Sequence, residues 1–163
     1  MDNAKVTINN SDIHLSGITR TAFHAGGNSV TTLNNCRLSN NSPYTDKMNT
    51  VWMLGFRGTN RATQCTENAT VYYNNCHIKS NGWGVCSVDG GVKTRMYFKD
   101  TTLELKGSSA RGYGAFSIGD CFISYDHCTL DVNGYPLLIG GGAGMENQKS
   151  DGEITNDTII NSP

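Results

Sequence analysis

The chain has 163 residues, which is enough for one domain with a hydrophobic core. Its formal net charge is −1 and only 17% of its residues are charged, so it lacks the basic surface that follows a nucleic-acid backbone or an anionic membrane. No apolar run reaches the roughly 20 residues that span a bilayer. The composition therefore argues against nucleic acid as a partner and against a membrane span, and 19 glycines with 18 asparagines indicate a chain rich in strands and turns.

One ten-residue pattern recurs along the chain. It consists of alternating apolar residues, a pair of residues that is usually Asn or Asp, a small residue, and a second alternating segment. Its copies span 6–15, 31–40, 71–80, 96–105, 123–132 and, in shortened form, 154–160. At the small residue the successive spacings are 25, 40, 25, 27 and 30 residues. The long spacing indicates one repeat plus an insertion, which we place within 42–69.

A second motif, a short alternating strand that ends at a glycine, lies between the copies. It spans 22–27, 53–58, 85–90, 115–120 and 136–141. Each repeat then holds about three short strands and three turns, with no helical periodicity. One repeat therefore predicts one coil of a solenoid, in which coils about 4.8 Å apart pair equivalent strands in parallel and bury a shared interior.

This repeat resembles the pectate-lyase-like right-handed parallel β-helices over nearly the whole chain. In that family an asparagine ladder commonly occupies the turn between the second and third sheets. The residues that resemble this ladder are Asn10, Asn35, Asn75, Asp100 and Asp157. His127 is expected to interrupt it. The resemblance implies an all-β right-handed parallel β-helix of five to six coils with three short sheets, forming one domain over 1–163.

The repeat also gives positions to the cysteines. Cys36, Cys76 and Cys128 share the column of small residues and are expected to lie inside the solenoid. Cys36 and Cys76 are one coil apart, within reach of a disulfide, whereas Cys128 lies two coils, or about 10 Å, from Cys76. No CxxC pair, closely spaced His/Cys cluster or complete phosphate-binding motif occurs, so we expect neither a metal nor a cofactor.

The outward face of the first sheet is the predicted site, because enzymes that resemble this fold commonly bind substrate there. If Phe23 and Phe116 point inward, then His24, Ser87 and Ser117 point outward. The two serines are predicted substrate contacts. Trp52, in the insertion, and Trp83 are predicted to stack on sugar rings or, alternatively, to cover the side of the helix.

Four further assignments describe possible catalysis on this face. Asp89 and Asp120 lie in adjacent coils with an offset of one residue, so they are expected about 5 to 7 Å apart, which suits the paired carboxylates of glycoside hydrolysis. An enzyme would use them as acid and base, Arg57 to hold a substrate carboxylate, and His24 for proton transfer or a sugar contact. Asp beside Gly at a strand end is equally ordinary turn chemistry.

Two functions remain open at this stage. The first is a non-catalytic module for adhesion or glycan recognition, belonging to a secreted or cell-surface bacterial or phage protein whose export signal lies outside this sequence. The second is a carbohydrate-active enzyme: a polysaccharide lyase, a glycoside hydrolase or an epimerase. No amphipathic helix is predicted to cover either end of the stack, so flanking coils or an end-to-end homo-oligomer are expected.

Overall fold

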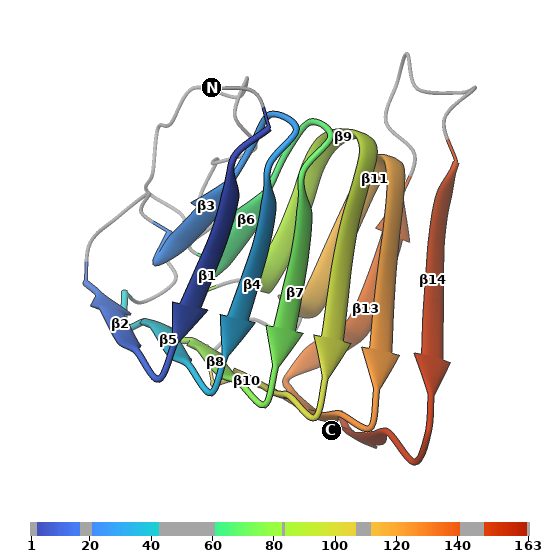
Figure 1. The fold of residues 1–163 in the computed structure, drawn as a ribbon. Helices are drawn as coiled ribbons and strands as arrows, with labels where there is room; N and C mark the ends of the chain where they lie inside the picture. Colours follow the sequence, from blue (N-terminus) through green and yellow to red (C-terminus); the bar gives the residue numbers. More distant parts are fainter. Residues whose placement is uncertain are drawn as a thin grey trace.

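A computed structural model describes residues 3–16, 21–42, 61–82, 84–106, 112–140 and 149–162, and all of its regular structure is β-strand. The strands are β1 (Lys5–Asn9), β2 (Asp12–Leu15), β3 (Phe23–Ala25), β4 (Val30–Asn34), β5 (Arg37–Asn40), β6 (Thr63–Cys65), β7 (Thr70–Asn74), β8 (His77–Ser80), β9 (Gly84–Lys99), β10 (Thr102–Leu105), β11 (Gly112–Asp126), β12 (Thr129–Val132), β13 (Gly134–Gly140), β14 (Ser150–Thr155) and β15 (Ile159–Asn161). They wind into a parallel β-solenoid (Figure 1).

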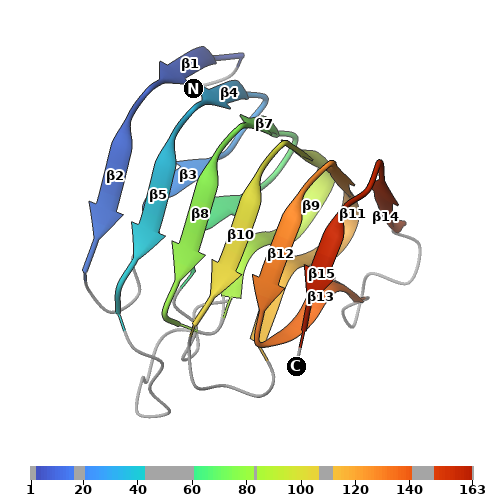
Figure 2. The ribbon, with the colours of Figure 1, turned by 90° about the horizontal axis from the view of Figure 1, so that it is seen from below.

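The solenoid has three faces. The first face holds β3, β6, β13 and the first halves of β9 and β11, and the second face holds β1, β4, β7, β14 and the second halves of β9 and β11. The third face is a six-stranded parallel sheet in the order β2-β5-β8-β10-β12-β15 (Figure 2). Because β9 and β11 pass from the first face to the second without a break, these two faces form one nine-stranded sheet.

The predicted fold class is confirmed, with a small difference in the number of coils. Four stretches, β3–β5, β6–β8, β9–β10 and β11–β12, run without interruption through all three faces, giving about four turns instead of five to six. The coil at the β1 end contributes strands to two faces only, and the coil at the β14 end is divided between two described segments.

The third coil differs from the prediction on the first face. The strand expected at 53–58 lies outside the described residues, and β6 occupies its place, pairing with β3 on one side and β9 on the other. Residues 61–69 therefore belong to the coil and not to the insertion predicted at 42–69. Thr63 and Gln64 are polar yet buried, so this strand lacks the apolar alternation that marks the others.

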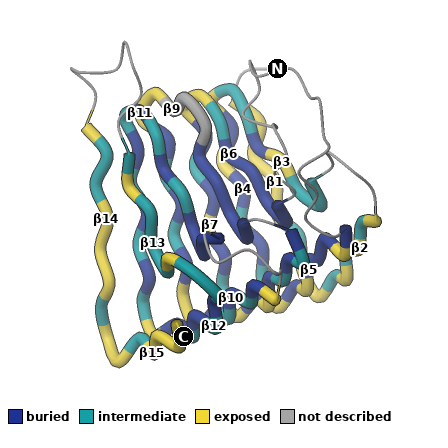
Figure 3. Tube along the Cα trace, turned by 180° about the vertical axis from the view of Figure 1, so that it is seen from behind, coloured by how far each residue is buried: buried dark blue, intermediate teal, exposed yellow. Residues whose placement is uncertain are grey.

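The interior is built from columns of equivalent residues, and Figure 3 shows buried positions recurring along the strands in the middle of the stack. Tyr73, Phe98 and Tyr125 form a fully buried aromatic stack with ring centroids 4.8 and 5.3 Å apart. Such pairs contribute about 0.5–1.5 kcal/mol each beyond the burial of their area. Another column, of aliphatic residues, comprises Leu38, Ile78, Leu103 and Leu130.

The column of small residues supplies hydrogen-bond donors to the backbone. The thiol of Cys76 lies 3.4 Å from the carbonyl oxygen of Asn74 and 3.5 Å from that of Leu33, one coil away. The hydroxyl of Thr101, in the same column, donates to Lys99 at 2.8 Å and to Tyr73 at 3.1 Å. Ser, Thr and Cys are therefore interchangeable here because each is small and carries a donor. All six cysteines are buried free thiols, so Cys36 and Cys76 are not joined by a disulfide.

We expect the thiols of the native protein to resist an aromatic disulfide reagent at pH 8. Burial raises the pKa of Cys65 and Cys86 to about 12 and that of Cys76 to about 11, which leaves almost no reactive thiolate. The measurement is reagent absorbance before and after unfolding in guanidinium chloride, with slow modification at first and six thiols afterwards. Fast reaction of several thiols in the folded state, or fewer than six after unfolding, would contradict this packing.

Candidate functional site

On the first face, Asp89 and Asp120 are offset further in strand register than predicted. Asp120 is registered opposite Val92, three residues beyond Asp89, because Ala115 and not Phe116 pairs with Cys86 and because a register shift between Ser117 and Gly119 adds one more residue. The offset is therefore three residues and not the predicted one. The Asp120 carboxylate lies 3.5 Å from Nη1 of Arg95. The side chain of Asp89 lies outside the described part of the structure.

The two predicted serines are both fully buried. Ser87 is registered with the outward column, and its hydroxyl accepts a hydrogen bond of 2.5 Å from Nη1 of the buried Arg61. Ser117 is registered with Val88 and belongs to the inward column, so its expected outward direction is wrong. The repeat predicts that Phe116 is equivalent to Cys86, whereas the structure pairs Ala115 with Cys86. A shift of one residue moves each side chain to the opposite face of the strand.

His24 is exposed on β3, as expected, with its Nδ1 3.3 Å from Oε1 of Gln64 and its Nε2 3.4 Å from Oγ1 of Thr66. The other predicted site residues, Arg57, Trp52 and Trp83, lie outside the described residues. Any role of these residues in binding or catalysis stays a prediction.

A different region gathers polar side chains, at the bend between the second and third faces. One residue in each coil adopts a positive φ of 50–54° there: Asn10, Asn35, Asn75, Asp100 and His127. This left-handed conformation is unfavourable for most L-residues, and Asn and Asp tolerate it best. The side-chain amides form the predicted ladder, with Asn35 donating to Asn10 at 3.1 Å and Asn75 donating to Asn35 at 2.8 Å.

The amide ladder does not continue through His127, in line with the prediction. Nδ1 of His127 lies 2.7 Å from Oδ1 of Asp100, so an imidazole–carboxylate pair replaces an amide pair. The next coil contains one extra residue at the bend, because both Asn156 and Asp157 have positive φ. Counted from β14, Asn156 lies opposite His127, and counted from β15, Asp157 does. Asn156 donates to Oδ1 of Asp126 at 2.6 Å.

A second amide row lies directly before the first, and the repeated pair of polar residues does not by itself distinguish the two rows. Asn34 donates to Asn9 at 2.8 Å and Asn74 donates to Asn34 at 2.9 Å. On the same outward surface the ring of Tyr72 stacks on that of Tyr97, with centroids 4.9 Å apart, and 37% of Tyr72 is exposed. The consecutive asparagines of each repeat therefore supply two parallel rows of amides beside exposed aromatic side chains.

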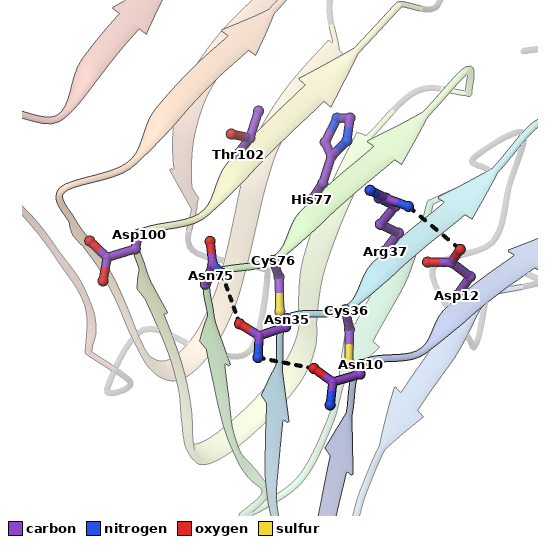
Figure 4. A pocket seen from close by; sticks show the side chains of 10 residues that line it. All are labelled: Asn10, Asp12, Asn35, Cys36, Arg37, Asn75, Cys76, His77, Asp100 and Thr102. Atoms are coloured by element: carbon purple, nitrogen blue, oxygen red, sulfur yellow. Dashed lines mark hydrogen bonds and ion pairs between the residues drawn. The ribbon is translucent and has the colours of Figure 1, made fainter.

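The bend contains a hollow of about 690 Å³, which we call the turn groove. Its lining comprises Asn10, Asp12, Asn35, Cys36, Arg37, Asn75, Cys76, His77, Asp100 and Thr102 (Figure 4). The asparagine ladder runs along the bend, and outward residues at the starts of β2, β5, β8 and β10 form the other side. A smaller hollow of about 170 Å³ shares Asp100 and Thr102 and extends the groove past His127.

Charged groups in the turn groove are exposed and largely compensated. Nη1 of Arg37 lies 3.7 Å from Oδ2 of Asp12, and both side chains are more than half exposed. Nε2 of His77 lies 2.9 Å from Oε2 of Glu104, on the adjoining strand. The groove therefore offers amides, a hydroxyl, a guanidinium, an imidazole and carboxylates on successive coils. Within the described ranges no cluster of three or more His, Cys, Asp or Glu side chains is arranged to hold a metal ion.

Comparison with known proteins does not extend these observations. The chain matches no known protein family, no curated protein and no solved structure. In the part of the chain that the structure describes, no helix has the length and apolar character needed to cross a bilayer. The fold and the turn groove therefore carry the functional argument.

The left-handed bend predicts different effects for two substitutions of Asn35. Both Asn35→Gly and Asn35→Ala remove the amide that bonds Asn10 and Asn75, at a cost of about 0.5–1.5 kcal/mol for each lost bond. Alanine also acquires an unfavourable left-handed backbone, costing about 1–2 kcal/mol, which glycine avoids. Urea unfolding should therefore rank wild type above Asn35→Gly and Asn35→Gly above Asn35→Ala. Equal midpoints for the two variants would show that the bend is not constrained as described.

The pair of His127 and Asp100 predicts a pH-dependent contribution to stability. The hydrogen bond with Asp100, and then its charge, raise the pKa of His127 in the folded state. Stability from this pair is fully present below the unfolded histidine pKa of about 6.5 and is lost as the pH rises through the higher folded value. Asp100→Asn is the matched variant because asparagine also tolerates the left-handed bend.

The wild type should exceed Asp100→Asn in unfolding midpoint by more at pH 5.5 than at pH 9. Titration of the His127 ring by NMR should give a higher pKa in the wild type than in the variant. An unchanged ring pKa would contradict the pairing.

Proposed function

We propose that this chain is a non-catalytic glycan-recognition module whose ligand lies in the turn groove. The observation that carries the proposal is the repetition of hydrogen-bonding side chains on successive coils along one open hollow. A polysaccharide is a chain of similar units rich in hydroxyl groups, so a surface that repeats its donors and acceptors at the coil spacing suits such a ligand.

The amide ladder supports this choice of ligand. An asparagine side chain has two N–H donors and two lone pairs on its oxygen, and the ladder uses one of each at Asn35. Asn35 lines the groove, and the hydroxyl groups of a glycan can both donate to and accept from its remaining lone pair and N–H. Compensation between Arg37 and Asp12 favours a neutral or weakly charged glycan over a nucleic acid.

We also propose which fold family the chain belongs to and where the protein is located. The parallel stack and the asparagine ladder support membership of the pectate-lyase-like β-helices, and that resemblance implies a place outside the cell or on its surface. The carbohydrate-active enzyme is the alternative. The wide register offset between Asp89 and Asp120, together with the burial of both predicted serines, favours recognition over catalysis on the first face.

A glycan array followed by calorimetry with the polysaccharides that bind tests this function. The double variant Arg37→Ala/His77→Ala should bind at least about tenfold more weakly, since a hydrogen bond to the charged guanidinium contributes about 1.5–3 kcal/mol and 1.4 kcal/mol corresponds to a factor of ten. Lys106→Ala is the matched control, because Lys106 lies beside the third face and pairs with Asp131 outside the groove.

Equal affinity of wild type, double variant and control would place the ligand elsewhere. Depolymerisation of a bound polysaccharide that is lost in Asp120→Ala would replace the module with the enzyme. Unfolding curves of every variant show whether a change in binding reflects the groove or the fold.

A further inference from the structure

The end of the stack at β13–β15 exposes residues that belong to interior columns. Ile154 continues the column of Tyr125, and Ile160 continues the column of Leu130. Tyr125 and Leu130 are fully buried, whereas Ile154 and Ile160 are 44% and 42% exposed. Ile139, on the first face of the same coil, is 43% exposed. These three isoleucines form the end surface.

The strands beside this surface also have unpaired backbone. Among the described residues, β14 pairs with β11 only and β15 pairs with β12 only, so each is an edge strand. The strands β1 and β2 are edges at the opposite end, where they pair with β4 and β5 only. Parallel edges with free N–H and C=O groups are templates for another strand.

The two ends of the solenoid complement each other column by column. If the coil of β1 and β2 from a second copy is placed on β14 and β15 in the register used throughout the stack, apolar residues meet apolar residues. Ile8 meets Ile154 and Ile13 meets Ile160. Asn10 meets the bend formed by Asn156 and Asp157.

Charge agrees with this register. Lys5 heads the column that ends at Asp151, so the two ends bring opposite charges together. The Asp151 carboxylate is 48% exposed and lies 3.0 Å from Lys149, on its own segment, so it is accessible to a second cation.

We propose that the end surface binds the β1–β2 end of a second copy of this chain, so that molecules stack head to tail and continue both sheets. Such an interface is heterologous, because each copy uses a different end, and it adds each copy by a further step along the same axis. The assembly is therefore an open filament whose turn groove runs on from one copy to the next. This proposal is independent of what the groove binds.

The test is sedimentation velocity of the full chain over a range of concentrations. The mean mass should grow with concentration beyond a dimer. Ile154→Lys/Ile160→Lys blocks the end surface and should stay monomeric, because the junction would bury two unpaired lysines. Val92→Lys is the control, since Val92 is 50% exposed on β9, in the middle of the stack.

A mixing experiment identifies the head-to-tail geometry. The blocked variant keeps its β1–β2 end, so a small amount added to wild type should cap the assemblies and shorten them severalfold. The charge reversals Lys5→Asp and Asp151→Lys should each weaken assembly, and their combination should restore it. A wild-type chain that stays monomeric, a dimer that grows no further, or a blocked variant that leaves assembly unchanged would overturn the proposal, whatever the glycan measurements show.

Discussion

The left-handed bend between the second and third faces is the constraint on which the solenoid depends. In the coils of Asn10, Asn35 and Asn75, one residue of positive φ turns the chain there, and its side chain bonds the equivalent residue one coil away. The following small residue anchors the turn by donating to backbone carbonyls of its own coil and its neighbour. Once both contacts are in place, the register of the strands on either side of the bend is fixed, and the interior columns follow.

The strand register is regular at the bend and irregular on the first face, and this difference distinguishes the turn groove from the site predicted on the first face. The second and third faces meet at the bend and keep equivalent residues opposite one another from β1 to β14 and from β2 to β15. Among the residues that the structure describes, the first face has no comparable ladder, and its pairing between β9 and β11 shifts near Gly119. A regular groove therefore forms at the bend, whereas groups on the first face lose their alignment.

The sequence predicts the fold best at positions where one physical requirement selects the same type of residue in every repeat. Asn35 marks the bend because few residues tolerate its backbone conformation. The apolar residues that recur at every second position, such as the equivalent Ile8 and Leu33, mark the second face. The strands of the first face were not predicted correctly, for two reasons. Thr63 and Gln64 are buried without being apolar, and Phe116 has the character of an inward residue although Ala115 takes that position. The turn groove depends on side-chain direction around a bend, which strand periodicity does not describe.

The aromatic stack of Tyr73, Phe98 and Tyr125 lies toward the middle of the solenoid, and Ile154, which continues its column at the β14 end, is partly exposed. Each coil contacts only the coils beside it, so stability is a sum of neighbour contributions and is smallest at the ends. Fraying should accordingly begin at the terminal coils and move inward, leaving the aromatic coils as the last ordered remnant. Such a molecule unfolds stepwise, one coil after another, whereas a globular domain unfolds as a single cooperative unit.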